Sequence, residues 1–332
     1  MRKRIIHTVI LSIICINWCK AQVDPHFSQY YAYPLYLNPG LTGVLEGDYR
    51  ATVIHRNQWS NFGKAFITTG ASADMTTSGK TNIGINLFNQ SAGDGGYKFL
   101  QGAFSLAYSG LQLDAQGYKR VMLGIQIGFI NRRFDPDKLK FGDQWVAGIG
   151  YDPSRISGDI LTVTSATAFD AAAGIVYLDA NPEKRANPYA GFSINHLTRP
   201  EDPFIAGIKY RLPYRYTLHG GMKFHVNESL ILTPNFIYMQ QGNATETMLG
   251  AYLQVAASAE VDVMGGLNYR IKDAVSPYAG LRIANLQIGL SYDVNTSALG
   301  RQVSNSNSIE MSLTITGRRN QKDFYYLCPP RF

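Results

Sequence analysis

The stretch Val121-Met-Leu-Gly-Ile-Gln-Ile-Gly-Phe-Ile-Asn131 decides the fold. Apolar residues occupy every second position from Val121, and Gly124, Gln126 and Gly128 alternate with them. A period of two sends successive side chains to opposite faces of a β-strand. The same alternation recurs at 286–293 and at 309–316. The chain is therefore predicted to consist of strands with one apolar face and one polar face.

Fourteen segments carry this strand pattern, with turns between them. They lie at 49–56, 65–74, 81–89, 97–113, 118–133, 169–179, 188–197, 214–226, 229–240, 245–256, 260–271, 274–283, 285–294 and 307–317. The connections after the first, third, fifth, seventh and thirteenth segments are long, and those after the second, fourth, eighth, tenth and twelfth are short. The connections after the ninth and eleventh segments depart from this alternation, because they are short too. The alternation of apolar and polar residues by itself also fits a soluble β-sandwich. A sandwich, however, does not require long and short connections to alternate.

Short turns at one rim and longer loops at the other are typical of outer-membrane barrels, and an even strand number returns both ends to the periplasm. We therefore predict an all-β fold, a transmembrane antiparallel β-barrel of about fourteen strands over residues 48–317. No apolar run of 18 or more residues follows residue 22, which argues against a helical membrane protein.

Residues 1–21 are predicted to be a cleaved signal peptide. Three cations at 2–4 precede the apolar stretch 5–16, and Cys19 and Ala21 stand at positions −3 and −1 of a cleavage site. A lipid-modified start is disfavoured because a large residue precedes each candidate cysteine. The mature chain is expected to begin at Gln22 and to reach the cell outer membrane.

Charge and cysteine content exclude two further classes. The full chain has a net charge of +7, but four cations leave with the signal peptide, so the mature chain is near +3. The segment 318–332, predicted to be a basic periplasmic tail, carries that remainder, and the body is close to neutral. A nucleic-acid partner is therefore not expected. Only Cys328 remains after cleavage, so no disulfide framework is expected.

Two segments do not follow the strand pattern. Residues 22–47 contain three prolines and a group of tyrosines, which indicates that this segment packs against something. We expect it to be periplasmic or plug-like, with the barrel lumen as one candidate position. The connection 134–168 is the longest, and loops of this size are usually functional or disordered.

No catalytic residue, metal or cofactor is predicted. His219 and His225 share a strand face, but six residues separate them by about 20 Å, too far for one metal. The aspartates at 135, 137 and 143 resemble a calcium loop that lacks its glycine and its final glutamate. The remaining histidines have no partners at ligand spacing, namely His26, His55 and His196.

Four stretches resemble the PorP/SprF family of Bacteroidetes membrane proteins. The run Asp24-Pro-His-Phe-Ser-Gln-Tyr-Tyr-Ala-Tyr-Pro-Leu-Tyr-Leu-Asn-Pro-Gly-Leu-Thr-Gly43 is similar to the family's opening segment, with Gly40 in place of the commoner Ala. His55-Arg-Asn-Gln-Trp59 resembles its Arg-x-Gln-Trp element, and Ser291-Tyr-Asp-Val-Asn-Thr-Ser-Ala-Leu299 resembles its penultimate-strand signature. The ending Cys328-Pro-Pro-Arg-Phe332 is also similar, with one extra proline, so the resemblance spans residues 24–332.

The resemblance implies an outer-membrane protein linked to the type IX secretion system. Members of this family either belong to the core apparatus or help a large secreted adhesin to reach or stay on the surface, as in gliding motility. The implied partners are outer-membrane lipid, type IX secretion components, and a secreted type IX substrate or adhesin. No catalytic residue is implied. A passive porin for small solutes and, less favoured, an outer-membrane hydrolase remain as alternatives.

The motif residues are the candidates for contacts with the lumen or with a partner, and the outer loops, chiefly 134–168, are expected to dock the secreted protein. These candidates are Asp24, Pro25, Phe27, Ser28, Gln29, Tyr30, Asn38, Pro39, Arg56, Gln58, Trp59, Asp293 and Asn295.

Overall fold

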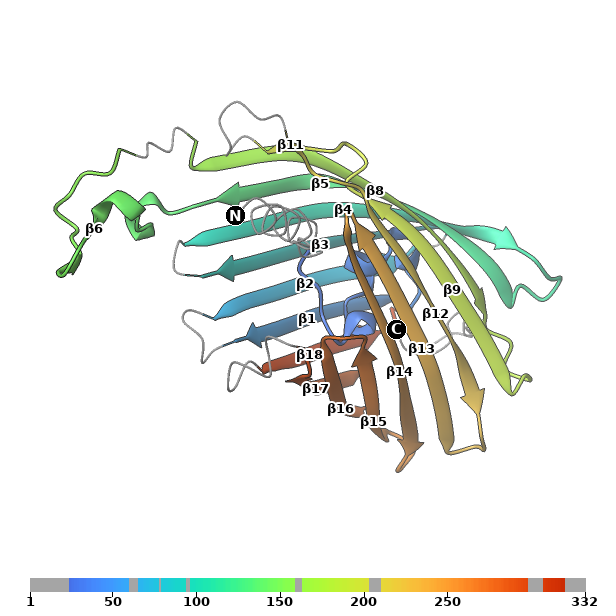
Figure 1. Ribbon diagram of the computed structural model, residues 1–332. Helices are drawn as coiled ribbons and strands as arrows, with labels where there is room; N and C mark the ends of the chain where they lie inside the picture. Colours follow the sequence, from blue (N-terminus) through green and yellow to red (C-terminus); the bar gives the residue numbers. More distant parts are fainter. Residues whose placement is uncertain are drawn as a thin grey trace, which may run out of the picture.

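The computed structural model describes residues 24–59, 65–77, 79–93, 96–158, 163–202, 210–297 and 307–319. Its long strands form one closed antiparallel barrel (Figure 1). These strands are β1 (Tyr49–Gln58), β2 (Phe66–Thr76), β3 (Thr81–Ala92), β4 (Tyr97–Gln112), β5 (Lys119–Arg133), β8 (Ser165–Asp179), β9 (Ala186–Asn195), β12 (Arg215–His225), β13 (Leu230–Gln241), β14 (Ala244–Ala256), β15 (Val261–Arg270), β16 (Ala274–Ile283), β17 (Leu286–Asn295) and β18 (Ser308–Gly317).

The predicted barrel of fourteen strands is confirmed, and each strand end lies within four residues of its predicted position. Neighbours in sequence pair as hairpins, and β1 closes the barrel by pairing with β18 from Tyr49↔Gly317 to Gln58↔Ser308. Closure pairs the backbone groups of every strand, so the sheet has no free edge. The predicted signal peptide and most of the predicted tail, from residue 320, lie outside the described residues.

The two faces of the wall follow the alternation in the sequence. In β5, Leu123, Ile125 and Ile127 are exposed on the outer face, whereas Gly124 and Gln126 are buried on the inner face. Apolar side chains facing outward and polar or small ones facing inward are typical of a membrane barrel.

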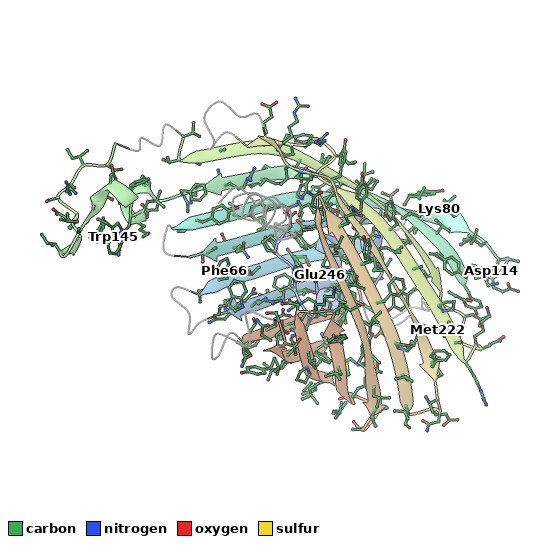
Figure 2. All side chains as sticks on the ribbon, in the orientation of Figure 1. Phe66, Lys80, Asp114, Trp145, Met222 and Glu246 are labelled. Carbon is green, nitrogen blue, oxygen red and sulfur yellow. The ribbon has the colours of Figure 1, made fainter. Side chains whose placement is uncertain are left out.

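The rims differ as predicted. At the short-turn rim, near Lys80 and Asp114, the connections are brief, and at the long-loop rim, near Phe66 and Trp145, several are long (Figure 2). The connection from β5 to β8 covers 134–164, because β8 begins earlier than predicted. It contains η3 (Pro136–Lys138), η4 (Gly142–Gln144), β6 (Trp145–Val146) and β7 (Gly150–Tyr151), and it extends away from the wall (Figure 1). A second small hairpin joins β10 (Glu201–Asp202) to β11 (Tyr210–Arg211).

None of the helices within the described residues has the length and apolar character needed to cross a membrane.

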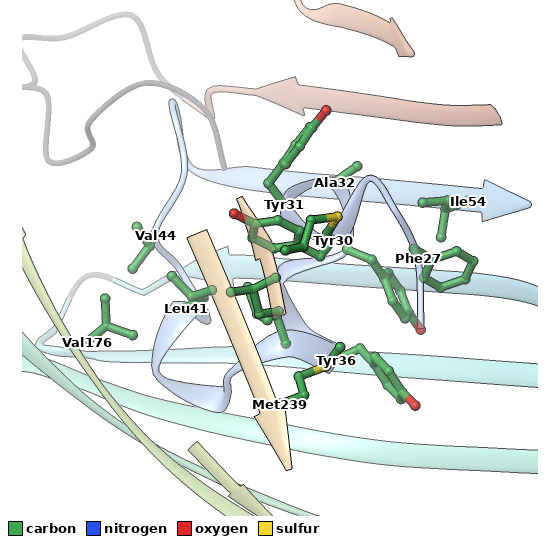
Figure 3. Packing of buried hydrophobic residues seen from close by; sticks show 14 of the residues in the cluster. Phe27, Tyr30, Tyr31, Ala32, Tyr36, Leu41, Val44, Ile54, Val176 and Met239 are labelled. Atoms are coloured by element: carbon green, nitrogen blue, oxygen red, sulfur yellow. The ribbon is translucent and has the colours of Figure 1, made fainter. Parts of the chain in front are cut away.

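Residues 24–47, called the plug below, occupy the lumen. The plug forms three short helical turns, η1 (Tyr30–Ala32), α2 (Pro34–Leu37) and η2 (Pro39–Leu41), whose residues are all buried. Its side chains pack against residues of the wall such as Ile54, Val176 and Met239 (Figure 3).

The plug runs from one rim to the other. Its first residue, Asp24, is held at the long-loop rim by a hydrogen bond from its N–H to Gln241 Oε1 at 2.7 Å. Its last residues lead into Tyr49 at the short-turn rim. As expected from an even number of strands, the first and last strands of the barrel start and end at the short-turn rim. The plug, in contrast, begins at the long-loop rim.

Candidate functional site: the plugged lumen

Aromatic rings form the apolar part of the contact between the plug and the wall. Tyr36 stacks on Phe88 of β3 with ring centroids 4.7 Å apart, and Phe27 meets Tyr33 edge to face at 5.7 Å. All four side chains are buried. Such rings bury a large apolar area and prefer these geometries. They fill the space that fourteen strands would otherwise leave to water.

Glycines of the wall allow the plug backbone to come close. A Cβ on Gly124 of β5 would lie 2.2 Å from the carbonyl carbon of Pro39, and one on Gly174 of β8 would lie 1.9 Å from Asn38 Oδ1. A side chain at either position would overlap the plug. The polar and glycine positions on the inner faces of these strands thus shape a surface that fits η2.

Asn38 fixes the start of η2 and ties it to three strands. Its Oδ1 accepts a hydrogen bond from the Gly40 N–H at 2.8 Å, as an N-cap residue does. Its Nδ2 donates to the carbonyls of Ile175 and Phe192 and lies 3.1 Å from His219 Nε2.

A charge network in the lumen, called the central charge network below, is formed by Arg56, Arg270, Asp293 and Glu310 and holds the plug towards the long-loop rim. Arg56 bonds Glu310 at 2.6 Å and Asp293 at 3.0 Å, and Arg270 bonds Asp293 at 2.8 Å. All four side chains are buried.

The plug completes this network. The two oxygens of Glu310 accept the backbone N–H groups of Ser28 and Gln29 at 2.7 and 2.9 Å, and Ser28 Oγ donates to Asp293 at 2.8 Å. Breaking one partner of a buried ion pair typically costs about 3–5 kcal/mol, although an intact pair adds little net stability. The network therefore specifies where the plug sits more than it adds to stability.

A second cluster, the rim latch, consists of Asp24, Asp170, His196 and Arg215. The His196 ring lies between two carboxylates, with Nε2 at 2.5 Å from Asp24 and Nδ1 at 2.8 Å from Asp170. Arg215 adds a contact to Asp24 at 3.3 Å, and Gln241 donates to its other oxygen at 2.9 Å.

Electrostatics set the protonation of the latch. Burial alone would lower the pKa of His196, but the charge of Asp24 and the hydrogen bonds to both aspartates outweigh it and raise the pKa to about 9. Burial likewise opposes ionisation of Asp24, yet His196, Arg215 and Gln241 hold its pKa well below the usual range. The latch is therefore a charged pair at neutral pH.

A third anchor holds the plug near the short-turn rim. Arg50 of β1 pairs with Asp74 of β2 at 2.8 Å, and Asp74 also accepts the Gly43 N–H at 2.8 Å. Arg50 donates in addition to the carbonyl of Val44 at 3.1 Å. The plug is thus fixed by three anchors, two towards the long-loop rim and one near the short-turn rim.

Most residues singled out from the sequence meet in this lumen. Asp24, Ser28, Gln29, Asn38, Arg56 and Asp293 form the polar contacts above, and Phe27 and Pro39 pack against the plug or the wall. Tyr30 donates to Asn235 at 2.7 Å, and the Pro25 carbonyl accepts from Tyr36 at 2.8 Å.

Three of the singled-out residues do not touch the plug network in this way. Gln58 and Trp59 line a cavity of about 520 Å³ at the long-loop rim. Asn295 instead accepts the Ser297 N–H at 2.9 Å and so caps a turn.

Sequence reasoning missed the wall residues that receive the plug, chiefly Arg50, Asp74, His196, Arg215, Arg270 and Glu310. Four of them, Arg50, Asp74, Arg270 and Glu310, occupy strand positions whose side chains point into the lumen. The alternation of the sequence was the signal available for these positions. It identifies lumen-facing positions but does not say which of them meet.

No hydrolytic site is assembled around the latch. Both ring nitrogens of His196 are engaged by carboxylates, so neither is left to activate a nucleophile in this arrangement. Among the described residues, no group of His, Cys, Asp and Glu side chains has a geometry that could hold a metal ion.

Comparison with known proteins gives a family match and a fold match. Residues 19–315 match the family described as "Type IX secretion system membrane protein PorP/SprF". No curated protein matches the sequence.

Solved outer-membrane channels are similar in fold. The CymD monoaromatic hydrocarbon channel has a TM-score of 0.50 at 11% identity, over 85% of this chain and 91% of that one. The P. putida toluene transporter TodX has a TM-score of 0.49 at 9% identity, over 85% and 93%. The KdgM porin has a TM-score of 0.40 at 5% identity, over 80% and 98%. At this identity the likeness to CymD shows the fold alone.

The wall glycines give a first prediction. Gly124→Ala places a methyl group against the Pro39 backbone, so it should lower the unfolding free energy by about 1–3 kcal/mol, as overpacking does. Amide hydrogen exchange at 38–43 should accelerate. Gly265→Ala is the control, because its Cβ would meet no atom within 4 Å. Equal effects of the two variants would contradict the close fit.

The latch gives a second prediction, from pH. Because folding raises the pKa of His196 from 6.5 to about 9, its stabilisation is complete below pH 6.5 and is lost as pH rises through 9. The unfolding free-energy difference between the wild type and His196→Gln should therefore shrink by on the order of 3 kcal/mol across that window.

Denaturant titrations at several pH values measure this difference. His55→Gln, at an exposed histidine that bonds only Thr69 among the described residues, is the control outside the latch. A difference between the wild type and His196→Gln that stays constant with pH would rule out the charged latch.

Proposed function

The chain belongs to the PorP/SprF family of type IX secretion system membrane proteins, and from this premise we propose that it is a non-enzymatic partner in secretion or surface anchoring. The fold and the family together support an outer-membrane location. The proposed client is a secreted type IX substrate, such as a large surface adhesin of the kind used in gliding motility. The proposed signal peptide, cleaved before Gln22, would export the chain.

The plug is the observation that carries this proposal. A porin needs a continuous water-filled lumen, whereas here three anchors hold a buried segment across it. When the lumen is filled, the rims and loops are the surfaces through which a barrel can bind other proteins. We propose that the connection 134–164, which extends beyond the long-loop rim, docks the secreted protein, and that the short-turn rim faces other secretion components.

The motif residues then serve two roles. We propose that Asp24, Ser28, Gln29, Asn38, Arg56 and Asp293 act from inside, by fixing the plug that shapes the outer face. Gln58 and Trp59 lie at that face and are candidates for direct contact with a partner.

Surface display tests the role in secretion. Deletion of the gene should remove at least one type IX substrate from the cell surface, measured by surface proteolysis or antibody labelling of intact cells. Re-expression of the wild-type chain should restore it. Normal display of every type IX substrate in the deletion strain would overturn the proposal.

Conductance separates the partner from the passive porin. The wild-type barrel in a planar bilayer should show no steady conductance, and a variant that lacks residues 24–43 should conduct, because the lumen loses its filling. The variant's fold is checked by its resistance to unfolding in detergent. Steady conductance by the wild type at a level similar to that of the variant would favour the porin.

A further inference from the structure

The cavity above the plug has two chemically different sides. Its volume is about 520 Å³, which lies within the range of ligand pockets. Trp59, Phe66 and Tyr97 line one part, and Glu246 and Asp273 line another. Asp24 and His26 of the plug form part of its surface, so the cavity exists only with the plug in place.

The charges around the cavity leave an excess of carboxylates. Six carboxylates belong to the cavity, the central charge network or the rim latch, against three guanidinium groups and the imidazoles of His26 and His196. The carboxylates are Asp24, Asp170, Glu246, Asp273, Asp293 and Glu310. Both guanidinium groups that line the cavity already bond carboxylates, Arg56 with Asp293 and Glu310, and Arg270 with Asp273 and Asp293, although the buried Arg56 Nε donates to no group among the described residues. An anion would have to displace these partners, whereas a cation would reduce the excess.

Glu246 supplies a specific acceptor. Its Oε2 lies 2.9 Å from His26 Nε2, but its Oε1 is buried and accepts no hydrogen bond from the described part of the chain. The Glu246 side chain is 13% exposed and lines the cavity, so an ammonium or guanidinium group there would be attracted to its carboxylate.

Trp59 adds an aromatic surface held in a strained backbone. Its φ of +58° lies in the left-handed region, which bulky residues rarely adopt, and its ring meets Phe66 edge to face at 5.1 Å. Strain of this kind persists where surrounding structure enforces it, often at functional sites. Trp is also the best aromatic partner for a cation.

We propose that this cavity binds a Lys or Arg side chain on an extended segment of the secreted protein, placed between the aromatic rings and the carboxylates of Glu246 and Asp273. This inference rests on the proposed function, because it names the part of the client that the barrel holds. The plug then acts as part of a receptor, since it supplies one surface of the binding site.

The binding test uses Trp59 as a local probe. The full sequence has three tryptophans, at 18, 59 and 145, and the first lies in the predicted signal peptide. In purified Trp145→Phe barrel that starts at Gln22, Trp59 is the remaining fluorophore. Titration with blocked tri-lysine and tri-arginine peptides should change its fluorescence to saturation, and blocked tri-glutamate should not.

Variants locate the contact. Glu246→Gln should weaken tri-lysine binding by about ten-fold or more, as expected for loss of a close charge pair. Asp273→Asn is a second variant, which should weaken binding too. Because the Asp273 side chain is half-exposed, this substitution should not impair folding. Glu201→Gln, at an exposed carboxylate near the same rim that pairs with Arg211, is the matched control and should bind as the parent does.

The outcomes separate this inference from the proposed function. Equal responses to tri-lysine and tri-glutamate, or unchanged binding in both Glu246→Gln and Asp273→Asn, would overturn the cation site. Client display in cells that carry Glu246→Gln with Asp273→Asn is then compared with display in the deletion strain. Loss in the deletion strain but normal display in the double variant would overturn this inference alone, whereas normal display in both would overturn the proposed function.

Discussion

The contact between Glu310 and the plug is the interaction on which the rest of the structure depends. The plug brings backbone N–H groups into a lumen from which it displaces water, and each buried N–H needs an acceptor. Glu310 offers two oxygens to the adjacent N–H groups of Ser28 and Gln29 and is itself neutralised by Arg56. A carboxylate there satisfies two donors and one cation, and an apolar side chain would satisfy none.

The same constraint accounts for the pattern of the wall. A membrane barrel must expose apolar side chains to lipid, so its polar and charged groups can lie only on the inner face. In this chain much of the inner face contacts the plug and not a water column. Arg50, Arg56 and Arg270 each meet a carboxylate of the wall that also binds the plug. The inner face is therefore closer to a protein interior than to a pore, with aromatic packing between layers of paired charge.

The sequence was sufficient for the barrel and insufficient for the lumen, for a physical reason. The strands follow from an alternation that is local, so the pattern of a segment such as 121–131 predicts a strand without knowledge of its neighbours. The partners of the plug depend on register accumulated around the barrel. Ser28 and Glu310 are 282 positions apart in the chain, and a one-residue slip in a strand would turn Glu310 to lipid.

Some parts of the site carried a sequence signal and others carried none. The prolines and tyrosines of 22–47 indicated packing but left the position open between periplasm and lumen. Motif resemblance singled out Arg56 and Asp293 separately, and only the fold brings them within 3.0 Å of each other. His196 carried no signal, because its partners Asp24 and Asp170 lie 172 and 26 positions away and no ligand spacing links them.

The way in which the plug is held bears on whether it could act as a gate. A gate that opens a pore needs a segment held at few points, so that a modest change in free energy releases it. Here the latch and the central charge network hold the plug towards the long-loop rim, and the Arg50–Asp74 pair holds it near the short-turn rim. Release would break the hydrogen bonds of the plug at all three places and would take the Asp24 carboxylate away from His196 and Arg215. Asp24 also lies at the long-loop rim, so the plug forms part of the cavity there. A segment that fills the lumen and forms part of the cavity at the long-loop rim therefore supports the partner role proposed above more than passage of a solute.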